Sequence, residues 1–564
     1  SCSRIEVDGM QPLVLLLGSV FVIQYVSVAS VQIHGRSTGA AWAAKTASMK
    51  DCKVHWFEQQ TDHFSWIPPP GNRTTFRQRY FICHPPGLAG QAVQKKPKNI
   101  FYYFGNEDNV ELYVNNTGLM WESAEEFQAV MVFAEHRFYG ETMPFPPGTE
   151  GCMSYLTTEQ ALADSARLLQ LIRAGRSPVP WKAEQGAVIG FGGSYGGMMA
   201  AWFRIKYPHL VDGVVAGSAP IWSFLGMEPP YNSGGYYDIV TRDASAAGGA
   251  TDNCKNAFRA GQPRIYALAD SADGRKLLSK SFRTCVDLAT PEQAKGLVAW
   301  AQEPWSWLAM GNFPYASGYL LHGHGTLPPW PVRAACAALD ALTPASSDSE
   351  LLAGMREAAA VYYNHSGSVH CFYNGNTDEH SSPPRTMLGG ASRIRKTLAN
   401  NNSNKVRSNA AADMCEGDWD YQWCTEMVQP FSSDGEHDMF WPPVPFDLAA
   451  STKGCQQQWG VTPRPYWVDL EYGAKNLRGA TNIVFSNGLL DPWMAGGVTK
   501  SVSPSVVALI VEEGAHHLDF MFSHDLDPAQ VKQVRETERE HMRRWIAERA
   551  LDLQHRITPE TALV

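Results

Sequence analysis

The chain has 564 residues with a formal net charge of −9, and 44% of its residues are hydrophobic. This length exceeds that of one ordinary domain and predicts two domains, or one domain with a large insertion. No basic stripe accompanies the acidic balance, so we expect no nucleic-acid partner.

The N-terminal segment has the pattern of a secretory signal peptide. A nearly unbroken apolar run at residues 12–23 is followed by three small residues, the last of which is Ser30. A short apolar run before a small-residue cleavage site is typical of a signal that is removed on secretion. Gln24 and the shortness of the run disfavour the alternative, a signal anchor that stays in the membrane. We therefore assign residues 1–30 to a leader and signal peptide, and expect no stable membrane insertion after its removal.

Cysteine usage and glycosylation sequons agree with a secreted chain. Of the 11 cysteines, Cys2 lies in the leader, and the others form an even number that suits disulfides in an oxidising compartment. No cysteine or histidine spacing typical of a zinc site occurs, so we expect no metal. Four sequons predict surface glycans, and they lie at Asn72, Asn115, Asn364 and Asn401. We expect the secretory pathway, with the lysosome or the extracellular space as destination.

The first half of the mature chain predicts short strands that alternate with helices. The segment from His55 to Phe64 begins the fold. Strand patterns follow at residues 75–83, 100–104, 129–133, 187–191 and 210–216. A capping-box pattern, Thr157 with Gln160 three positions later, predicts the start of one helix, and residues 198–203 predict another. Such alternation predicts a parallel sheet that is covered on both faces.

The alternation stops between residues 226 and 440. That stretch is rich in Gly, Ala and Cys, and its helical patterns lie at residues 257–269, 291–301 and 350–362. We interpret 226–440 as an inserted, mainly helical, disulfide-containing cap domain. It would divide the sheet-forming domain into a first part at 47–225 and a second part at 441–552, with a C-terminal tail at 553–564.

The strand pattern resumes in the second part. Strands are predicted at residues 482–486 and 506–511, and a long charged helix at residues 528–550. The inward side of this helix is predicted to carry Val531, Val534, Met542 and Trp545.

Ser194 lies in the pattern of a nucleophile elbow. The segment Gly192-Gly193-Ser194-Tyr195-Gly196 stands between a predicted strand and a predicted helix, which is the context of the G-x-S-x-G elbow in α/β-hydrolases. Only small residues fit beside the serine in so sharp a turn, and a helix N-terminus favours the negative charge that develops in acyl transfer. The alternative is a glycine-rich turn with a bystander serine, which the flanking strand and helix disfavour.

Three residues have the types and the order of a catalytic triad. A serine hydroxyl needs a general base, and the base needs an orienting carboxylate. In α/β-hydrolases the order is Ser, Asp, His, each after a strand, and Ser194, Asp491 and His516 follow it. The 25 positions before His516 fit one crossover and one strand, whereas the 297 positions before Asp491 leave room for the cap. Taken singly, Asp491 fits a turn before Pro492 and His516 fits a surface loop, and His517 competes as the base.

Two backbone N–H groups are candidates for the oxyanion hole. α/β-Hydrolases use the N–H of the residue after the nucleophile and one from the loop after an earlier strand. These positions are Tyr195 and the loop Gly105-Asn106-Glu107, from which we select Asn106. A plain tight turn is the alternative for this loop.

Several segments carry a family resemblance that spans nearly the whole mature chain. They lie at residues 60–64, 105–107, 132–137, 191–209, 458–460, 485–493 and 514–519. On these segments the sequence resembles the serine carboxypeptidases of the lysosomal Pro-X carboxypeptidase family. That family also holds dipeptidyl peptidase II and thymus-specific serine protease.

The resemblance implies an α/β-hydrolase with a large helical cap between the elbow and the acid. It implies cleavage after proline in small peptides through an acyl-enzyme, without metal or cofactor. It also implies His516, the first of the two histidines, as the base. Met198 and Trp493 fall at pocket positions of the family, where they would form a flat apolar slot for a pyrrolidine ring, and core packing is the alternative for both.

Three positions depart from the family pattern. Asp108 stands where the family usually has Gly, and adds a carboxylate near the substrate mouth. Met521 stands where the family usually has Arg, which leaves the pH optimum open. Ser432 stands where a Cys is expected, so one family disulfide would be missing or re-paired, with Cys415 as a candidate partner.

We therefore expect a serine exopeptidase that cleaves after proline and releases the C-terminal residue. Release of N-terminal X-Pro dipeptides, as in dipeptidyl peptidase II, stays open because the cap decides which end of the peptide enters. An esterase on the same fold and a catalytically inactive, glycosylated binding protein are the alternatives from other classes. The expected partners are peptides with proline beside the cleaved bond, and a homodimer is left open.

Overall fold

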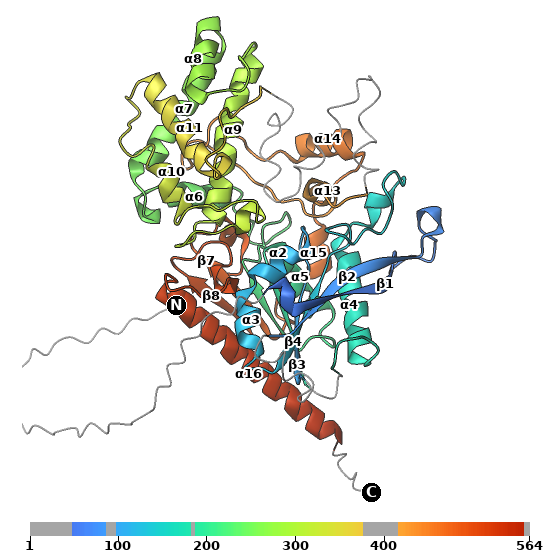
Figure 1. Cartoon of the computed structure of the whole chain (residues 1–564). Coiled ribbons are helices and arrows are strands. Elements are labelled where there is room, and N and C mark those ends of the chain that lie inside the picture. Colours follow the sequence, from blue (N-terminus) through green and yellow to red (C-terminus); the bar gives the residue numbers. More distant parts are fainter. Residues whose placement is uncertain (1–47, 86–96, 182–185, 376–414, 558–564) are drawn as a thin grey trace, which may run out of the picture. The chain divides into compact units, whose positions relative to one another are not determined.

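The computed structural model describes residues 48–85, 97–181, 186–375 and 415–557 (Figure 1). The chain divides into two compact units, residues 1–45 and residues 46–564, and all described residues belong to the second. The expected signal peptide, the sequon at Asn401 and the last residues of the expected tail lie outside the described residues. None of the described helices combines the length and the apolar character needed to cross a membrane.

Eight strands form one sheet at the centre of this unit. They are β1 (Cys52–Gln60), β2 (Thr75–Cys83), β3 (Asn99–Tyr103), β4 (Ala129–Ala134), β5 (Val188–Gly193), β6 (Gly213–Gly217), β7 (Ile483–Gly488) and β8 (Val506–Val511). Their order is β1-β2-β4-β3-β5-β6-β7-β8. β3 to β8 pair in parallel, whereas β2 is antiparallel to both β1 and β4. The predicted parallel sheet is thus wrong at this edge, because β1 and β2 are joined at residues 61–74 without the α-helical crossover that parallel neighbours need.

Most of the described helices follow the sheet strands or lie in the long segment between β6 and β7. They are α2 (Val110–Asn116), α3 (Gly118–Ala124), α4 (Thr158–Arg173), α5 (Tyr195–Lys206), α6 (Gly235–Asp243), α7 (Asp252–Ala269), α8 (Ala272–Phe282), α9 (Pro291–Met310), α10 (Pro331–Cys336), α11 (Asp348–Tyr363), α13 (Trp419–Thr425), α14 (Leu448–Trp459), α15 (Trp467–Tyr472) and α16 (Ala529–Ile557). Short 3₁₀ turns include η2 (Pro70–Asn72), η5 (Tyr319–Leu321), η6 (Pro492–Gly496) and η7 (Leu518–Phe520).

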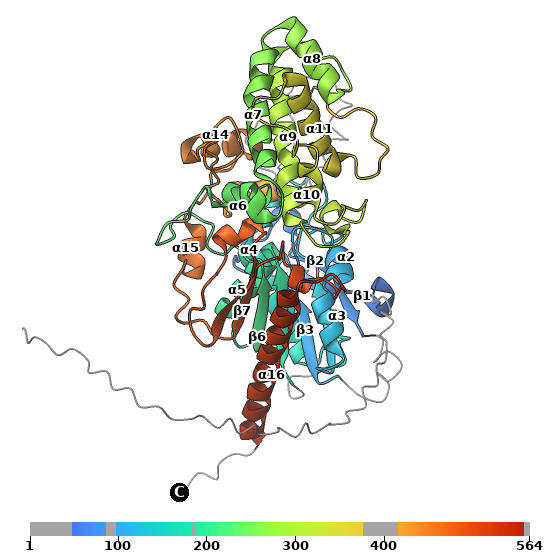
Figure 2. The same cartoon turned by 90° about the vertical axis from the view of Figure 1, so that its left-hand side faces the viewer.

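The central strand β3 shows how both faces of the sheet are buried. Side chains of a strand point alternately to opposite faces. Ile100 and Tyr102 join a core cluster with residues of α4 and α5, whereas Phe101 and Tyr103 join another with residues of α3 and α16. Helices therefore cover both faces (Figures 1 and 2). The predicted inward residues of α16 are buried, namely Val531, Val534, Met542 and Trp545. Together these features make the unit an α/β-hydrolase.

At the start of α4, the structure confirms one of the two hydrogen bonds of the predicted capping box. Thr157 is the N-cap residue, and its side chain accepts a hydrogen bond from the Gln160 backbone N–H at 3.2 Å. The reciprocal half is wrong, because the Gln160 side chain accepts from the His63 N–H at 3.0 Å and donates to Asp62 at 2.7 Å. Gln160 thus ties α4 to the loop between β1 and β2.

The inserted segment is helical, as predicted, and it contains more helices than the sequence indicated. α7, α9 and α11 contain the three predicted stretches, whereas α6, α8 and α10 were not predicted. α6 begins at Gly235 without a side-chain cap, so it carries no start signal in the sequence. Residues of α13 pack with Phe138 and Cys152 in a separate core cluster. We propose 226–440 as the extent of the cap, with 47–225 and 441–552 as the two parts of the domain that carries the sheet.

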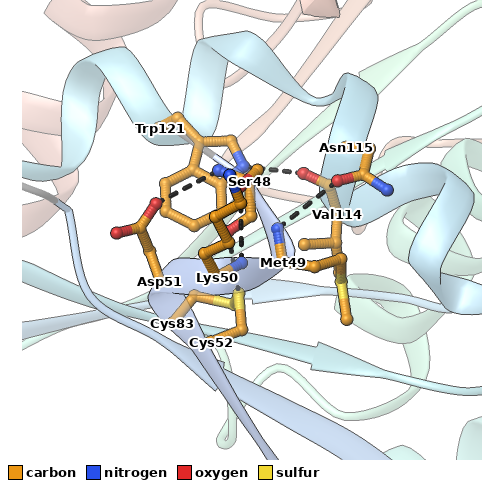
Figure 3. The surroundings of a disulfide bond; sticks show 9 residues. All are labelled: Ser48, Met49, Lys50, Asp51, Cys52, Cys83, Val114, Asn115 and Trp121. Carbon is orange, nitrogen blue, oxygen red and sulfur yellow. Dashed lines mark hydrogen bonds between the residues drawn. A yellow bond between two sulfur atoms is a disulfide. The ribbon is translucent and has the colours of Figure 1, made fainter. Parts of the chain in front are cut away.

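All ten cysteines after the leader are paired. The disulfides are Cys52–Cys83, Cys152–Cys415, Cys254–Cys336, Cys285–Cys371 and Cys424–Cys455. Cys415 is paired with Cys152. Each of these ten cysteines therefore has a partner, although Ser432 stands where a cysteine was expected. The first disulfide joins the start of β1 to the end of β2 (Figure 3).

Candidate active site

Ser194 occupies a strained turn between β5 and α5. Its backbone has φ 59° and ψ −128°, a conformation that is costly for a residue with a side chain and is found at nucleophile elbows. The neighbouring glycines make the turn sterically feasible. A Cβ on Gly192 would lie 2.0 Å from the Gly196 carbonyl oxygen, and one on Gly196 would lie 2.1 Å from Asn106 Oδ1. The elbow thus needs glycine on both sides of the serine.

Asp491 and His516 form a hydrogen-bonded pair after neighbouring strands. Asp491 follows β7, and its Oδ2 lies 2.9 Å from His516 Nδ1. Its other oxygen accepts from the Trp493 backbone N–H at 3.1 Å, so Asp491 is at once the turn residue and the partner of the histidine. His516 follows β8, and its backbone N–H donates to Met310 O of α9 at 3.1 Å. Both side chains are buried.

Ser194 and His516 line the same cavity. The strands that precede these residues are parallel, so their carboxyl ends meet at one edge of the sheet, where ligands bind in open α/β sheets. The cap contributes Met310 and residues around η5 to the cavity wall. The lining residues are Asn106, Glu107, Asp108, Leu112, Tyr113, Ser194, Trp307, Met310, Tyr319, Leu320, His322 and His516.

The second histidine has different partners. His517 Nε2 lies 3.2 Å from the Tyr319 hydroxyl, and Nδ1 has no hydrogen-bond partner among the described residues. Burial, with the nearby His516, lowers the pKa of His517 well below its usual value. The structure therefore joins Asp491 to His516, whereas the surroundings of His517 favour the neutral form of its ring. Met521, at the position where the resemblance expects Arg, is buried.

The two predicted oxyanion-hole residues both lie at the elbow. Tyr195 is the first residue of α5, and Asn106 lines the cavity. The Asn106 side chain donates to the Gly193 carbonyl at 2.7 Å and accepts from the Tyr103 hydroxyl at 2.9 Å. Asn106 thus braces the elbow through its side chain, a role that the sequence did not indicate. The oxyanion role of both backbone N–H groups stays a prediction.

The Tyr195 side chain belongs to a buried polar network below the elbow. Its hydroxyl lies 3.1 Å from His136 Nε2 and 3.1 Å from Thr158 Oγ1, and it accepts from Gln422 Nε2 at 3.1 Å. Burial raises the pKa of this hydroxyl well above its usual value. No local pattern could reveal the network, because Gln422 lies 227 positions from Tyr195.

Met198 and Trp493 lie in the hydrophobic core, and neither is among the lining residues of the cavity. The Trp493 ring N–H contacts Met310 Sδ at 3.1 Å, and its ring packs edge-on against Tyr236 and Phe431. Met310 itself lines the cavity, so Trp493 supports a wall residue. The pocket role of Met198 and Trp493 stays a prediction.

Three charged residues of the cavity were not assigned a role from the sequence. Glu107 and Asp108 follow β3, and His322 follows η5 in the cap. Burial, with the neighbouring Asp108 charge, raises the pKa of Glu107 to about 7. Asp108 forms an ion pair with His322 Nδ1 and thereby raises the pKa of His322. The sequence signalled Asp108 only as a departure from the family, and its partner lies 214 positions away.

The predicted glycosylation sites differ in their surroundings. Asn72 lies exposed at the end of η2. Asn115 is exposed near the Cys52–Cys83 disulfide, and its side-chain oxygen accepts from the Met49 N–H at 3.4 Å (Figure 3). Asn364 is half-buried, and its side-chain oxygen accepts from the Val369 N–H at 2.8 Å. Glycans at all four sites, Asn401 included, stay predictions.

Comparison with known proteins relates nearly the whole described chain to one family. The family described as serine carboxypeptidase S28 matches residues 59–538. The lysosomal Pro-X carboxypeptidases of Pongo abelii and Homo sapiens are 40% and 39% identical over 503 residues, with 89% of this chain and 89% of the relative covered in each case. The thymus-specific serine protease of Mus musculus is 26% identical over 506 residues, with 88% of this chain and 87% of that protein covered.

Proposed function

Because this chain belongs to the serine carboxypeptidase S28 family, we propose that it hydrolyses the peptide bond after proline and releases the C-terminal residue. The chain is a serine-type peptidase, and relatives named Pro-X carboxypeptidase cover 89% of it. The assignment of the active site rests on one observation. Asp491 is hydrogen-bonded to His516 Nδ1, and His516 shares its cavity with the Ser194 elbow.

The proposed mechanism begins with Ser194. Asp491 holds His516 Nδ1, which leaves Nε2 as the basic atom. Ser194 Oγ attacks the proline carbonyl carbon while His516 Nε2 takes the hydroxyl proton. The carbonyl oxygen becomes an oxyanion, to which the backbone N–H groups of Tyr195 and Asn106 would donate.

Collapse of this intermediate breaks the C–N bond. His516 returns the proton to the leaving amine, and the C-terminal amino acid departs. The proline carbonyl is then held as an ester on Ser194 Oγ. A water molecule, deprotonated by His516, attacks this ester, and the proton returns to Ser194 Oγ as the shortened peptide leaves. The proposed step sequence uses only groups of the chain, the peptide and water.

We place this activity in the secretory pathway or the lysosome. Five disulfides fit an oxidising compartment, and two relatives carry the word lysosomal in their names. The proposed partners are peptides with proline beside the cleaved bond. The homodimer stays a prediction, which light scattering of the purified protein tests.

One peptide tests the proposed function. It carries proline at position two and at the next-to-last position, and it is incubated with the wild type and with Ser194→Ala from acidic to neutral pH. We expect loss of one C-terminal residue in mass spectra, abolished by Ser194→Ala and retained by the exposed control Ser349→Ala. Loss of an N-terminal dipeptide instead would transfer the chain to the dipeptidyl-peptidase branch, and no cleavage would refute the peptidase.

A further inference from the structure

The wall of the catalytic cavity carries three ionisable groups that the proposed mechanism does not use. Glu107 and Asp108 come from the loop after β3, and His322 comes from the cap. His322 and His516 are the only basic residues among the described residues that line the cavity. Since His516 is held by Asp491, His322 is the basic residue among the described lining residues that is available to a ligand.

His322 is held in place by Asp108, which also favours the protonated form of its ring. Its Nδ1 forms the ion pair with the Asp108 carboxylate, and this contact raises the pKa of the ring. A protonated imidazole has two N–H donors. Asp108 takes one of them, and the other, on Nε2, has no hydrogen-bond partner among the described residues. The His322 side chain is 38% exposed, so a solute that enters the cavity can reach it.

Glu107, on the same cavity wall, has a carboxyl oxygen that makes no hydrogen bond to the described residues. Its Oε2 atom is buried and has no hydrogen-bond partner among the described residues. Burial and the neighbouring Asp108 raise the pKa of Glu107 and His516 lowers it, with a net value of about 7. A carboxyl group that keeps its proton is a hydrogen-bond donor. Several ionisable groups interact electrostatically with Glu107, namely Asp108, His516, His322, Tyr103, Tyr113, Tyr139, Tyr195 and Tyr319.

We propose that His322, oriented by Asp108, and Glu107 form the subsite that receives the free terminal carboxylate of the peptide substrate, with Glu107 protonated. This proposal rests on the proposed function. An enzyme that releases one C-terminal residue holds a carboxylate about one residue from the cleaved bond, which is ~3.8 Å between Cα atoms. His322 and Ser194 line one cavity, so a ligand in this cavity can contact both side chains. His322 supplies the charge, and Glu107 supplies a second donor.

The subsite makes binding of the carboxylate depend on pH. Two carboxyl groups in contact cannot both be ionised without repulsion, so one of them holds a proton. Below the Glu107 pKa of about 7, the Glu107 carboxyl donates to the substrate. Above it, the Glu107 carboxylate repels the substrate carboxylate, and KM rises. A substrate whose C-terminus is an amide carries no charge at that end, so its KM should not rise with pH in this way.

The first experiment compares an N-blocked Pro-Phe dipeptide with its C-terminal amide at pH 5. His322→Gln removes the cation, and His324→Gln is the matched control, an exposed histidine two positions along the same loop. We expect His322→Gln to lower kcat/KM for the free acid about 10- to 100-fold, mainly through KM, because a charge-assisted hydrogen bond is lost. The amide should change less than about threefold. Equal losses for acid and amide would overturn the subsite.

The second experiment follows Glu107→Gln from pH 5 to pH 8. Glutamine keeps a donor and never ionises. We expect KM for the free acid to rise with pH in the wild type but to stay flat in Glu107→Gln, with the thermal midpoint of unfolding measured to confirm folding. A KM that rises equally in both proteins would contradict the role of Glu107.

The outcomes separate this proposal from the proposed function. A wild type that cleaves neither the acid nor the amide after proline refutes the function itself. A wild type that cleaves both, with no difference between His322→Gln and His324→Gln, refutes only the subsite. Release of an N-terminal X-Pro dipeptide that is lost in Glu107→Gln would mean that the wall binds a substrate ammonium group, and would also refute it.

Discussion

Asp491 Oδ2 lies 2.9 Å from His516 Nδ1, and no such bond joins Asp491 to the adjacent His517. Two neighbouring histidines thus differ in chemical state. The hydrogen bond fixes the tautomer of His516 and would stabilise its imidazolium. Burial lowers the pKa of His517 well below its usual value and so favours the neutral ring. The contact between Asp491 and His516 can be tested by mutation of Asp491.

Asp491→Asn should lower kcat by roughly 10⁴-fold, because asparagine favours the wrong tautomer of the base. The measurement is steady-state hydrolysis of a proline-containing peptide, with the thermal midpoint of unfolding as a check on folding. Asp525→Asn, at an exposed carboxylate, is the control and should leave kcat unchanged. A loss below about tenfold in folded Asp491→Asn would exclude Asp491 as the orienting acid.

Gly192→Ala should distort the elbow. The added Cβ would lie 2.0 Å from the Gly196 carbonyl oxygen, which is backbone and cannot turn away. Overpacking of this kind costs roughly 1–3 kcal/mol, and we expect a lower free energy of unfolding in urea together with a large loss of kcat. Gly479→Ala is the matched control, since nothing lies within 4 Å of its added Cβ. Equal stability of the two variants would be inconsistent with the strained elbow.

Glu426→Gln should flatten the dependence of stability on pH. Burial raises the pKa of Glu426 from its ordinary value of 4.5 to about 7 in the folded chain, so its contribution is complete below pH 4.5 and is lost as pH rises through 7. The wild-type free energy of unfolding should therefore fall by up to about 1.4 kcal/mol per pH unit in this window from this group alone.

The glutamine variant lacks that component because it does not ionise. Its side-chain oxygen can still accept from the Thr158 N–H and hydroxyl, as Glu426 Oε1 does at 2.7 and 2.8 Å. Urea unfolding at several pH values checks the prediction. Glu436→Gln, at an exposed position, should keep the wild-type slope, and the same slope in Glu426→Gln would show that Glu426 is not the group responsible.

Replacement of Cys152 and Cys415 by alanine should destabilise the fold. This disulfide links residues 263 positions apart, and loss of a native disulfide costs about 2–5 kcal/mol. Because both cysteines belong to the core cluster that joins α13 to Phe138, we expect faster hydrogen exchange in α13 and a lower thermal midpoint. Unchanged exchange in α13 would mean that packing alone holds this cluster.

Much of the sheet could be predicted from local sequence. Strands β2 and β8 have the predicted bounds, because turn-forming residues such as Pro85 and Gly514 lie beside these runs of strand-forming residues. The antiparallel β1 edge could not be predicted, since pairing depends on which strand arrives beside it. Likewise, Gln160 has the spacing of a capping box, but its side chain binds the loop after β1 instead.

Local sequence was sufficient to predict the parts of the candidate site that local chemistry specifies. Glycine on both sides of Ser194, and the order of Ser194, Asp491 and His516 after separate strands, depend on steric and chemical needs that are visible in short segments. The folded structure was needed to show that His516 rather than His517 bonds to Asp491, and that Asp108 contacts His322, which lies 214 positions away. These contacts depend on how the cap and the sheet loops pack, and packing brings together residues whose separation along the chain carries no periodic signal.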